Sequence, residues 1–169
     1  MKRSLTAFIL FFTFLSIFSA CQEETITPYD PTAQAEADDK LIKEFMAKDT
    51  IMKNPVRTAS GLYYTKRTSG SGVQVKANDK VKVHYIGKFL NGSTFESSYV
   101  SGNPLEVFPV GGGRVIKGWD EGLQLMQEGE TARFYIPSGL AYGPGGSSSG
   151  RIPGNTCLIF DITVLDVNY

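Results

Sequence analysis

The sequence has little of the chemistry on which most catalytic sites depend. Its 169 residues include one histidine, His84, and two cysteines, Cys21 and Cys157. His84 lies in a segment where polar and apolar residues alternate, on the face opposite Tyr85. With no second histidine and no cysteine near it in the sequence, hydrolase triads and zinc sites lose their support, and we expect neither a metal ion nor a cofactor. The two cysteines stand in very different contexts, so we expect no disulfide between them and a free thiol at Cys157.

Net charge of either sign is also absent. The 17 Lys and Arg residues balance the 17 Asp and Glu residues, so no strong field attracts nucleic acid, and we expect no nucleic-acid partner. A glycine run at 111–113 could suggest a phosphate-binding loop, since Gly113 and Gly118 have a suitable spacing. Trp119 occupies the position of the required lysine, which excludes that interpretation. The chain length suits one domain with a smaller addition.

The first 20 residues have the pattern of an export signal. Lys2 and Arg3 precede an apolar run at 5–18, which is short for a membrane span and ends in small residues before Cys21. Residues 18–21, Phe-Ser-Ala-Cys, resemble a bacterial lipobox, in which the cysteine is lipidated and becomes the mature N-terminus. We interpret 1–20 as a lipoprotein signal peptide, with plain secretion or a retained anchor as alternatives. The resemblance implies a protein attached through Cys21 to a bacterial membrane, by expectation the outer membrane, facing the periplasm or the cell surface.

A flexible tether at 21–30 and a helix within 31–58 are expected next. Asp30 and Pro31 are typical of the N-cap and first position of a helix, which should end by about Lys53. The apolar stripe of this helix consists of Leu41, Ile42, Phe45 and Met46. Its charged face consists of Asp38, Asp39, Lys40, Lys43 and Glu44. The stripe could dock on the rest of the chain, serve as a spacer or pair with a second copy. We favour docking or a spacer, and a monomer is compatible with both.

Residues 59–169 have the pattern of one domain built mostly from strands. Alternating segments predict strands near 62–66, 81–85, 94–98, 104–108, 133–136 and 158–164. Asn91-Gly92 predicts a two-residue hairpin turn between two of these strands.

One short helix is expected inside this domain. Trp119, Leu123 and Met126 recur at helical spacing and share one face, and Gly129 is expected to end the helix as a left-handed C-cap. In the strand that follows, Phe134 and Ile136 alternate with Arg133 and Tyr135, which predicts one buried and one exposed face.

Three motifs in the domain resemble the FKBP-type peptidyl-prolyl cis-trans isomerases. They are Val-His-Tyr-x-Gly with a hairpin and Phe-Glu-Ser-Ser at 83–98, Val-Ile-x-Gly-Trp-x-x-Gly at 115–122, and Ala-Tyr-Gly at 141–143. Their order extends the resemblance over about residues 60–168. It implies an α+β fold, in which a curved antiparallel sheet of five to six strands wraps around one short helix. The N-terminal helix would be an addition to that fold.

The resemblance also implies a proline-binding pocket. Its catalytic residues would be Tyr85, Phe95, Glu96, Val115, Ile116, Trp119, Tyr142 and Phe160, and its further substrate contacts Leu105, Val107 and Ile152. Leu105 and Val107 stand where relatives often have phenylalanine, so this wall would be aliphatic. The Gly- and Ser-rich run at 144–150 is interpreted as a flap over the pocket. A core role without any ligand is the alternative for Trp119, Leu105 and Val107.

Isomerisation of an X-Pro bond fits the scarcity of acid, base and nucleophile. The barrier is roughly 18 to 20 kcal/mol because amide resonance is lost as the bond twists, yet no bond is made or broken. A dry aromatic cavity disfavours the planar, charge-separated amide more than the twisted one. We expect unfolded, proline-containing exported polypeptides as substrates. A non-catalytic proline-peptide binding module or a tethered holdase chaperone is the alternative, and glycan capture a remote third.

Overall fold

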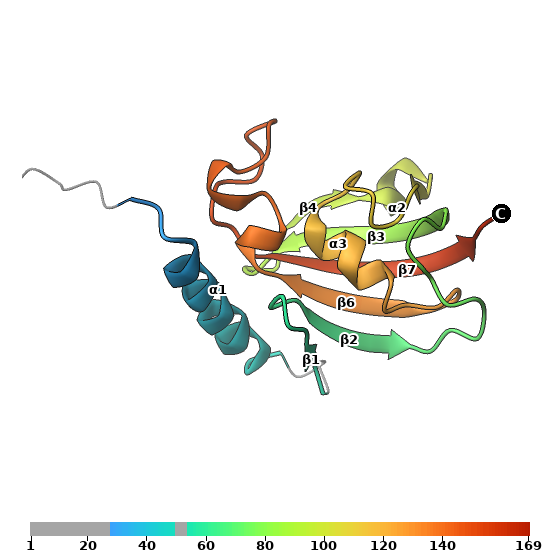
Figure 1. Ribbon diagram of the computed structural model, residues 1–169, viewed down its shortest axis with the longest axis horizontal. Coiled ribbons are helices and arrows are strands. Elements are labelled where there is room, and N and C mark those ends of the chain that lie inside the picture. Colours follow the sequence, from blue (N-terminus) through green and yellow to red (C-terminus); the bar gives the residue numbers. More distant parts are fainter. Residues whose placement is uncertain (1–27, 50–53) are drawn as a thin grey trace, which may run out of the picture.

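The computed structural model describes residues 28–49 and 54–169 (Figure 1). The predicted signal peptide at 1–20 and the predicted lipidation site Cys21 lie outside these residues. Within the described ranges, no helix combines the length and apolar character needed to cross a membrane.

The predicted α+β fold is confirmed, with one antiparallel sheet at its centre. The strands are β1 (Val56–Arg57), β2 (Tyr63–Thr68), β3 (Val81–Phe89), β4 (Thr94–Ser97), β5 (Leu105–Val107), β6 (Thr131–Ile136) and β7 (Leu158–Val167). Their order is β1-β2-β6-β7-β3-β4, and β5 pairs with the start of β3 while β4 pairs with its end. The short β1 was not expected from the sequence and adds a seventh strand. The β3–β4 connection spans residues 90–93, longer than the predicted two-residue turn.

One face of the sheet, the inner face, packs against α3 (Lys117–Leu123), as Figure 1 shows. The two glycines of this helix allow a very close approach to β6. A Cβ at Gly118 would lie 2.5 Å from Ile136 Cγ2, and a Cβ at Gly122 would lie 2.5 Å from Phe134 Cε2. No larger residue fits at either position without moving the helix away from the sheet.

α3 ends earlier than the sequence predicts. Its C-cap is Gln124, so Met126 and Gly129 both lie beyond it. Met126 is nevertheless fully buried. Gly129 has the expected positive φ, 81°, but it serves the turn into β6, where its N–H donates to Val164 O. The pattern therefore identified the buried residue and the left-handed glycine correctly and assigned both to the wrong element.

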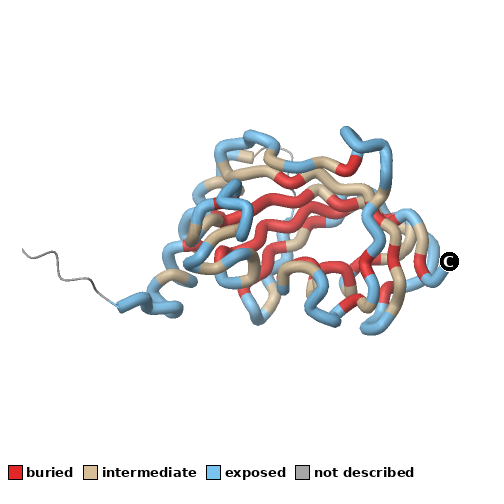
Figure 2. The backbone as a smooth tube through the Cα atoms, turned by 90° about the horizontal axis from the view of Figure 1, so that it is seen from above, coloured by how far each residue is buried: buried red, intermediate tan, exposed pale blue. Residues whose placement is uncertain are grey.

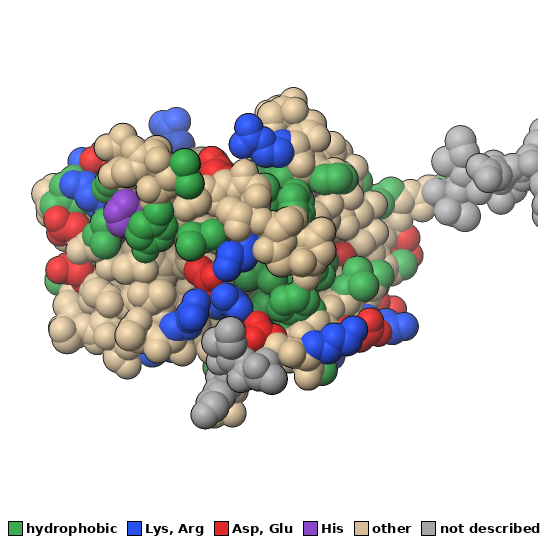
Figure 3. All heavy atoms as spheres, turned by 180° about the vertical axis from the view of Figure 1, so that it is seen from behind, with side chains coloured by type: hydrophobic (Ala, Val, Ile, Leu, Met, Phe, Trp, Pro, Cys, Tyr) green, Lys and Arg blue, Asp and Glu red, His purple; other side chains and the backbone are tan. Residues whose placement is uncertain are grey.

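The outer face of the sheet is partly covered by α1 (Pro31–Met46), so this helix docks on the domain. Asp30 caps it as predicted, accepting hydrogen bonds from Thr32 N and Ala33 N. Ile42 is fully buried against the outer-face residues Tyr63, Tyr135, Cys157 and Ile159. In the view from behind, acidic and basic side chains gather on the α1 side, next to hydrophobic ones (Figure 3).

Three side chains that the sequence assigns to exposed faces are buried, which corrects the prediction. Asp38 is 1% exposed, Arg133 8% and Tyr135 0%. In contrast Leu41, a member of the predicted apolar stripe, is 48% exposed. The cause is the docked helix: β6 is covered on both faces, and an alternating pattern does not show that a polar face will also be covered. Figure 2 shows buried residues running along the central strands.

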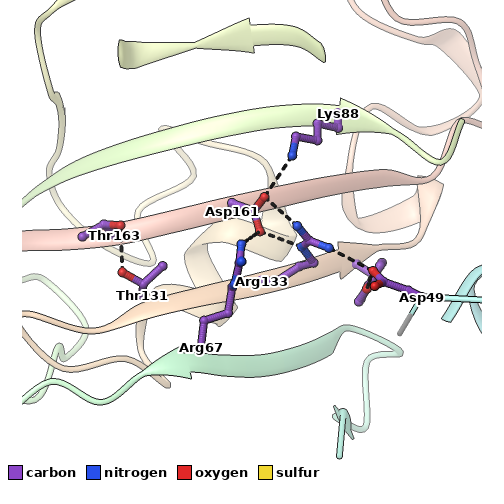
Figure 4. Close-up of polar contacts among 8 residues, drawn as sticks. Asp49, Arg67, Lys88, Thr131, Arg133, Asp161 and Thr163 are labelled. Carbon is purple, nitrogen blue, oxygen red and sulfur yellow. Dashed lines mark hydrogen bonds and ion pairs between the residues drawn. The ribbon is translucent and has the colours of Figure 1, made fainter. Parts of the chain in front are cut away.

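An ion network accommodates the buried guanidinium on the outer face (Figure 4). Arg133 donates through Nε and Nη2 to the two oxygens of Asp161, at 2.6 and 2.8 Å, and through Nη1 to Asp49 at 3.0 Å. Lys88 and Arg67 also contact Asp161, at 3.2 and 3.3 Å. The network fastens β6 to β7 and to the segment after α1, so we assign it a structural role.

Short helical turns occupy two connections that matter for the site. α2 (Ser98–Ser101), which the sequence did not predict, follows β4 directly. η1 (Ser138–Leu140) and η2 (Gly143–Gly145) lie in the long connection from β6 to β7. We call residues 138–157 of this connection the flap; they include the run at 144–150 that the sequence alone identified as a flap.

Candidate functional site

A cavity of about 100 Å³ opens on the inner face of the sheet, beside the N-terminus of α3. Eight of the eleven residues predicted from the sequence to form the pocket line it. They are Tyr85 on β3, Glu96 on β4, Leu105 on β5, Val115 and Ile116 before α3, Trp119 on α3, Tyr142 in the flap and Phe160 on β7. Segments distant in the sequence therefore converge on one pocket.

Three aromatic rings form the base of this cavity. The ring centroids of Tyr85 and Trp119 are 5.1 Å apart with planes at 83°, and those of Trp119 and Phe160 are 5.2 Å apart at 89°. These edge-to-face arrangements are favourable for aromatic rings and fix the rings relative to one another. Trp119 is only 3% exposed, and its buried indole N–H has no hydrogen-bond acceptor in the described part of the chain.

The remaining three predicted residues do not line the cavity. Phe95 packs behind it, with its ring 5.6 Å from Phe160 and at 87° to it. Val107 and Ile152 are 1% and 4% exposed and belong to the inner core. Their positions suit support of the pocket walls better than contact with a ligand.

Two residues that the sequence did not single out shape the pocket. Gly87 leaves room for the aromatic rings, since a Cβ there would lie 2.6 Å from Phe95 Cζ and 2.8 Å from Phe160 Cε1. Ser98 accepts a hydrogen bond from Tyr85 N at 2.9 Å and lies 2.9 Å from His84 Nδ1. Gly87 ends the Val-His-Tyr-x-Gly motif and Ser98 ends the Phe-Glu-Ser-Ser motif, so the sequence contained a signal for both.

The two tyrosine hydroxyls at the rim remain protonated near neutral pH. Burial, and then the charge of Glu96, raise the pKa of Tyr85 to about 12. Burial, and then Glu96, also raise the pKa of Tyr142. Both phenols therefore keep their O–H donors, and the Glu96 carboxylate lies close enough to affect both.

Two donors at the rim are unused. Ile116 is the N-cap of α3, and its carbonyl accepts from Trp119 N at 2.9 Å. Its own N–H, however, donates to no acceptor among residues 28–49 and 54–169. The Tyr142 hydroxyl likewise has no partner in those ranges, and the residue is 39% exposed. The cavity thus presents two hydrogen-bond donors above an apolar base.

The glycine run before α3 has its own internal acceptor. Gly111 N and Gly113 N donate to the two carboxylate oxygens of Asp120, at 2.9 and 2.8 Å. A carboxylate thus occupies the place that a phosphate would need. Among the described residues, no group of three or more His, Cys, Asp or Glu side chains is arranged to hold a metal ion.

Comparison with known proteins agrees with this geometry. The family model of the FKBP-type peptidyl-prolyl cis-trans isomerases matches residues 72–165. A probable FKBP-type peptidyl-prolyl cis-trans isomerase from Haemophilus influenzae is 45% identical over 140 residues, which cover 80% of this chain and 56% of that protein. Several curated relatives are matched over about half of their own length.

Solved structures show the same fold. The crystal structure of FkpA from Escherichia coli aligns with a TM-score of 0.68 and 38% identity, covering 80% of this chain and 60% of that one. A peptidyl-prolyl cis-trans isomerase from Pseudomonas syringae aligns with a TM-score of 0.65 and 31% identity, covering 85% and 99%. The family model spans more than half of the sequence, and the chain therefore belongs to the FKBP-type peptidyl-prolyl cis-trans isomerase family.

Proposed function

We propose that this chain is a peptidyl-prolyl cis-trans isomerase that assists the folding of exported proteins. One observation carries the proposal: an aromatic cavity at whose rim Ile116 N–H and the Tyr142 hydroxyl are both unpaired. A proline ring fits the apolar base, and the carbonyls of the flanking peptide can accept from the two donors. The substrate class is an unfolded polypeptide that contains an X-Pro bond.

The pocket favours the twisted amide by solvation and positioning. A planar amide is stabilised by charge separation, and the rings of Tyr85, Trp119 and Phe160 offer little to replace the water that solvates it. The twisted amide has lost that charge separation, so it is penalised less by the same surroundings. No proton, nucleophile or metal takes part in this step.

Each remaining residue has a supporting role in the proposal. Val115 and Leu105 supply aliphatic walls of the cavity. Glu96 organises the polar contacts beside Tyr85, raises the pKa values of both Tyr85 and Tyr142, and does not act as a base. Phe95, Val107 and Ile152 hold the walls in place from behind.

Export and lipid anchoring form the second part of the proposal. The sequence of 1–21 supports a signal peptide followed by a lipidated Cys21. The tether at 21–30 would then hold α1 and the isomerase domain near a bacterial membrane, by expectation the outer membrane. The substrates would be unfolded proteins in the periplasm or at the cell surface.

A binding module or holdase chaperone is the second candidate, because apolar side chains are exposed on the segments that directly follow β4 and β5, two strands that contribute residues to the pocket. Val100 on α2 is 89% exposed, Tyr99 54%, and Phe108, just after β5, 59%. Such side chains could retain an unfolded chain without catalysis.

The test measures the cis-to-trans rate of Leu-Pro and Ala-Pro tetrapeptides with the purified chain. Acceleration by the wild type that falls in a folded Phe95→Ala variant supports the isomerase. If the folded wild type binds the peptide but does not accelerate isomerisation, the binding module is the supported function.

Membrane fractionation of the wild type and a Cys21→Ser variant tests the proposed lipid anchor. Only the wild type should be found with membranes.

A further inference from the structure

We infer that α1 acts as a brace for the flap, and that Asp38 positions Tyr142 through its hydrogen bonds to Ser138. The inference rests on the proposed function in so far as Tyr142 is a substrate-binding residue. It assigns to the N-terminal helix a part in the working of the pocket, beyond that of a spacer.

The connection between α1 and the flap is a buried carboxylate with three donors. Asp38 Oδ2 accepts from both Ser138 N and Ser138 Oγ, each at 2.7 Å. Asp38 Oδ1 accepts from Gln34 Nε2 at 2.8 Å. Asp38 and Ser138 are 1% and 0% exposed, so water does not compete for these bonds.

Ser138 is the first residue of the flap, and a short rigid path leads from it to the pocket. It begins η1, in which Ala141 N donates to Ser138 O at 3.0 Å. Leu140 and Ala141 then pack against the inner core. Tyr142 is the next residue and lines the cavity. A displacement of Ser138 is therefore transmitted to Tyr142 within four residues.

The far end of the flap meets the same helix. Cys157 is buried in the cluster that contains Ile42 of α1, and the Asp38 carboxylate is close enough to contribute to the raised pKa of its thiol, after burial itself. Between these ends the flap is closed by its own hydrogen bonds, such as Ser147 N to Ile152 O at 2.9 Å and Asn155 N to Gly143 O at 2.8 Å. The flap is thus a self-contained loop whose two ends contact α1.

The hydrogen bonds of Asp38 carry much of this connection, because packing around them is incomplete. A cavity of about 230 Å³ lies between α1 and η1, lined among others by Pro31, Ala35, Pro137 and Leu140. Removal of the carboxylate would leave two buried donors of Ser138 without an acceptor. α1 also lies outside the residues 72–165 that match the family, so the brace is an addition to the shared domain.

The neighbouring residue Asp39 provides a matched control. It anchors the same helix to β1 and β2, through Arg57 at 2.8 Å and the Tyr63 hydroxyl at 2.8 Å, and it also pairs within the helix with Lys43 at 2.7 Å. Asp39→Ala therefore weakens the docking of α1 without removing any contact to the flap.

A conservative variant separates the hydrogen bonds of Asp38 from its negative charge. Asp38→Asn keeps one oxygen for Ser138, and the amide of Gln34 can turn to accept from the new NH₂ group. This variant should behave like the wild type, whereas Asp38→Ala should not. Ser138→Ala, which removes only the hydroxyl donor, should have a smaller effect in the direction of Asp38→Ala.

The experiment compares these variants in the full chain by amide hydrogen exchange of the flap and by tetrapeptide isomerisation. We expect Asp38→Ala to speed exchange in 138–157 about tenfold over Asp39→Ala and to lower kcat/KM roughly 3- to 10-fold. If the flap amides exchange at the same rate in Asp38→Ala and Asp39→Ala, the proposed brace is wrong. If Asp38→Ala does not fold, Ser138→Ala decides instead, and a flap exchange rate equal to that of the wild type would also overturn the proposal. An inactive wild type would refute the proposed function alone, since the exchange comparison needs no catalysis.

Discussion

The rings of Tyr85 and Trp119 meet edge to face, with centroids 5.1 Å apart and planes at 83°. Tyr85 belongs to β3 and Trp119 to α3, so their contact exists only while the helix is packed on the sheet. The base of the pocket is therefore also part of the core. Its polar rim is not, because Tyr142 is 39% exposed. This difference separates variants that should change activity alone from those that should change stability as well.

Removal of the Tyr142 hydroxyl should affect activity alone. The Tyr142→Phe variant loses one hydrogen bond to the substrate, worth about 1 kcal/mol, so kcat/KM should fall about 3- to 10-fold. The midpoint of thermal unfolding should stay the same, since the hydroxyl has no partner among the described residues. Tetrapeptide kinetics and calorimetry on the same preparation check both parts. A variant with wild-type kcat/KM would exclude this hydroxyl from substrate binding.

A methyl group at Gly87 should damage both the pocket and the fold. Because the new Cβ would lie 2.6 Å from Phe95 and 2.8 Å from Phe160, both rings must move. We expect Gly87→Ala to lower the free energy of unfolding by about 1 to 3 kcal/mol and to reduce kcat/KM. Gly139→Ala is the control, because nothing lies within 4 Å of its Cβ position. The free energies of unfolding of both variants are measured in urea. Equal values for Gly87→Ala and Gly139→Ala would contradict the predicted clash at Gly87.

The outer-face ion network should contribute to stability and leave catalysis unchanged. Arg133→Met leaves Asp161 with Lys88 and Arg67 only, and we expect a loss of about 3 kcal/mol in the free energy of unfolding. Lys40→Met, which breaks an exposed pair with Glu44 at 4.0 Å, should cost less than about 1 kcal/mol. The kcat/KM of folded Arg133→Met should match the wild type, because the network lies on the face opposite the pocket. A large loss of kcat/KM in the folded variant would argue against this division.

Acid should loosen the attachment of α1 at Asp39. The hydrogen bond from Lys43, with those from Tyr63 and Arg57, lowers the pKa of Asp39 from 3.8 to about 2, although burial opposes the shift. The folded state therefore binds fewer protons than the unfolded state, so this contribution is complete above about pH 4 and disappears as the pH falls through about 2. Asp39→Asn should flatten the dependence of unfolding free energy on pH in that window. Identical pH dependence in variant and wild type would contradict the shift.

The sequence predicted the site better than it predicted the surroundings of the site. Trp119, Tyr85 and Phe160 could be placed because each lies in a motif or a strand with a clear alternation. Phe95, Val107 and Ile152 were expected to contact the substrate but do not line the cavity. Sequence patterns do not separate lining from support, since both roles require a buried apolar side chain and differ by only a few ångströms.

The larger errors have one physical origin. Asp38, Arg133 and Tyr135 were placed on exposed faces because a local pattern gives the polarity of a residue and not what will cover it. The docked α1 supplies that cover, and the hydrogen bonds and ion pairs that make the burial of Asp38 and Arg133 acceptable come from residues far away in the sequence. Such pairings are determined by the tertiary structure, so no window of the sequence shows them.

The measurement that tests the central claim most directly is magnetisation exchange between the cis and trans signals of an Ala-Pro tetrapeptide at equilibrium. Catalytic amounts of wild-type chain should broaden and exchange these signals, and Tyr142→Phe should do so about 3- to 10-fold less efficiently. The cis-to-trans ratio of the free peptide should not change. If the folded wild type bound the peptide, as shown by shifted signals, and left the exchange rate at its uncatalysed value, the chain would be a binding module and the isomerase account would be wrong.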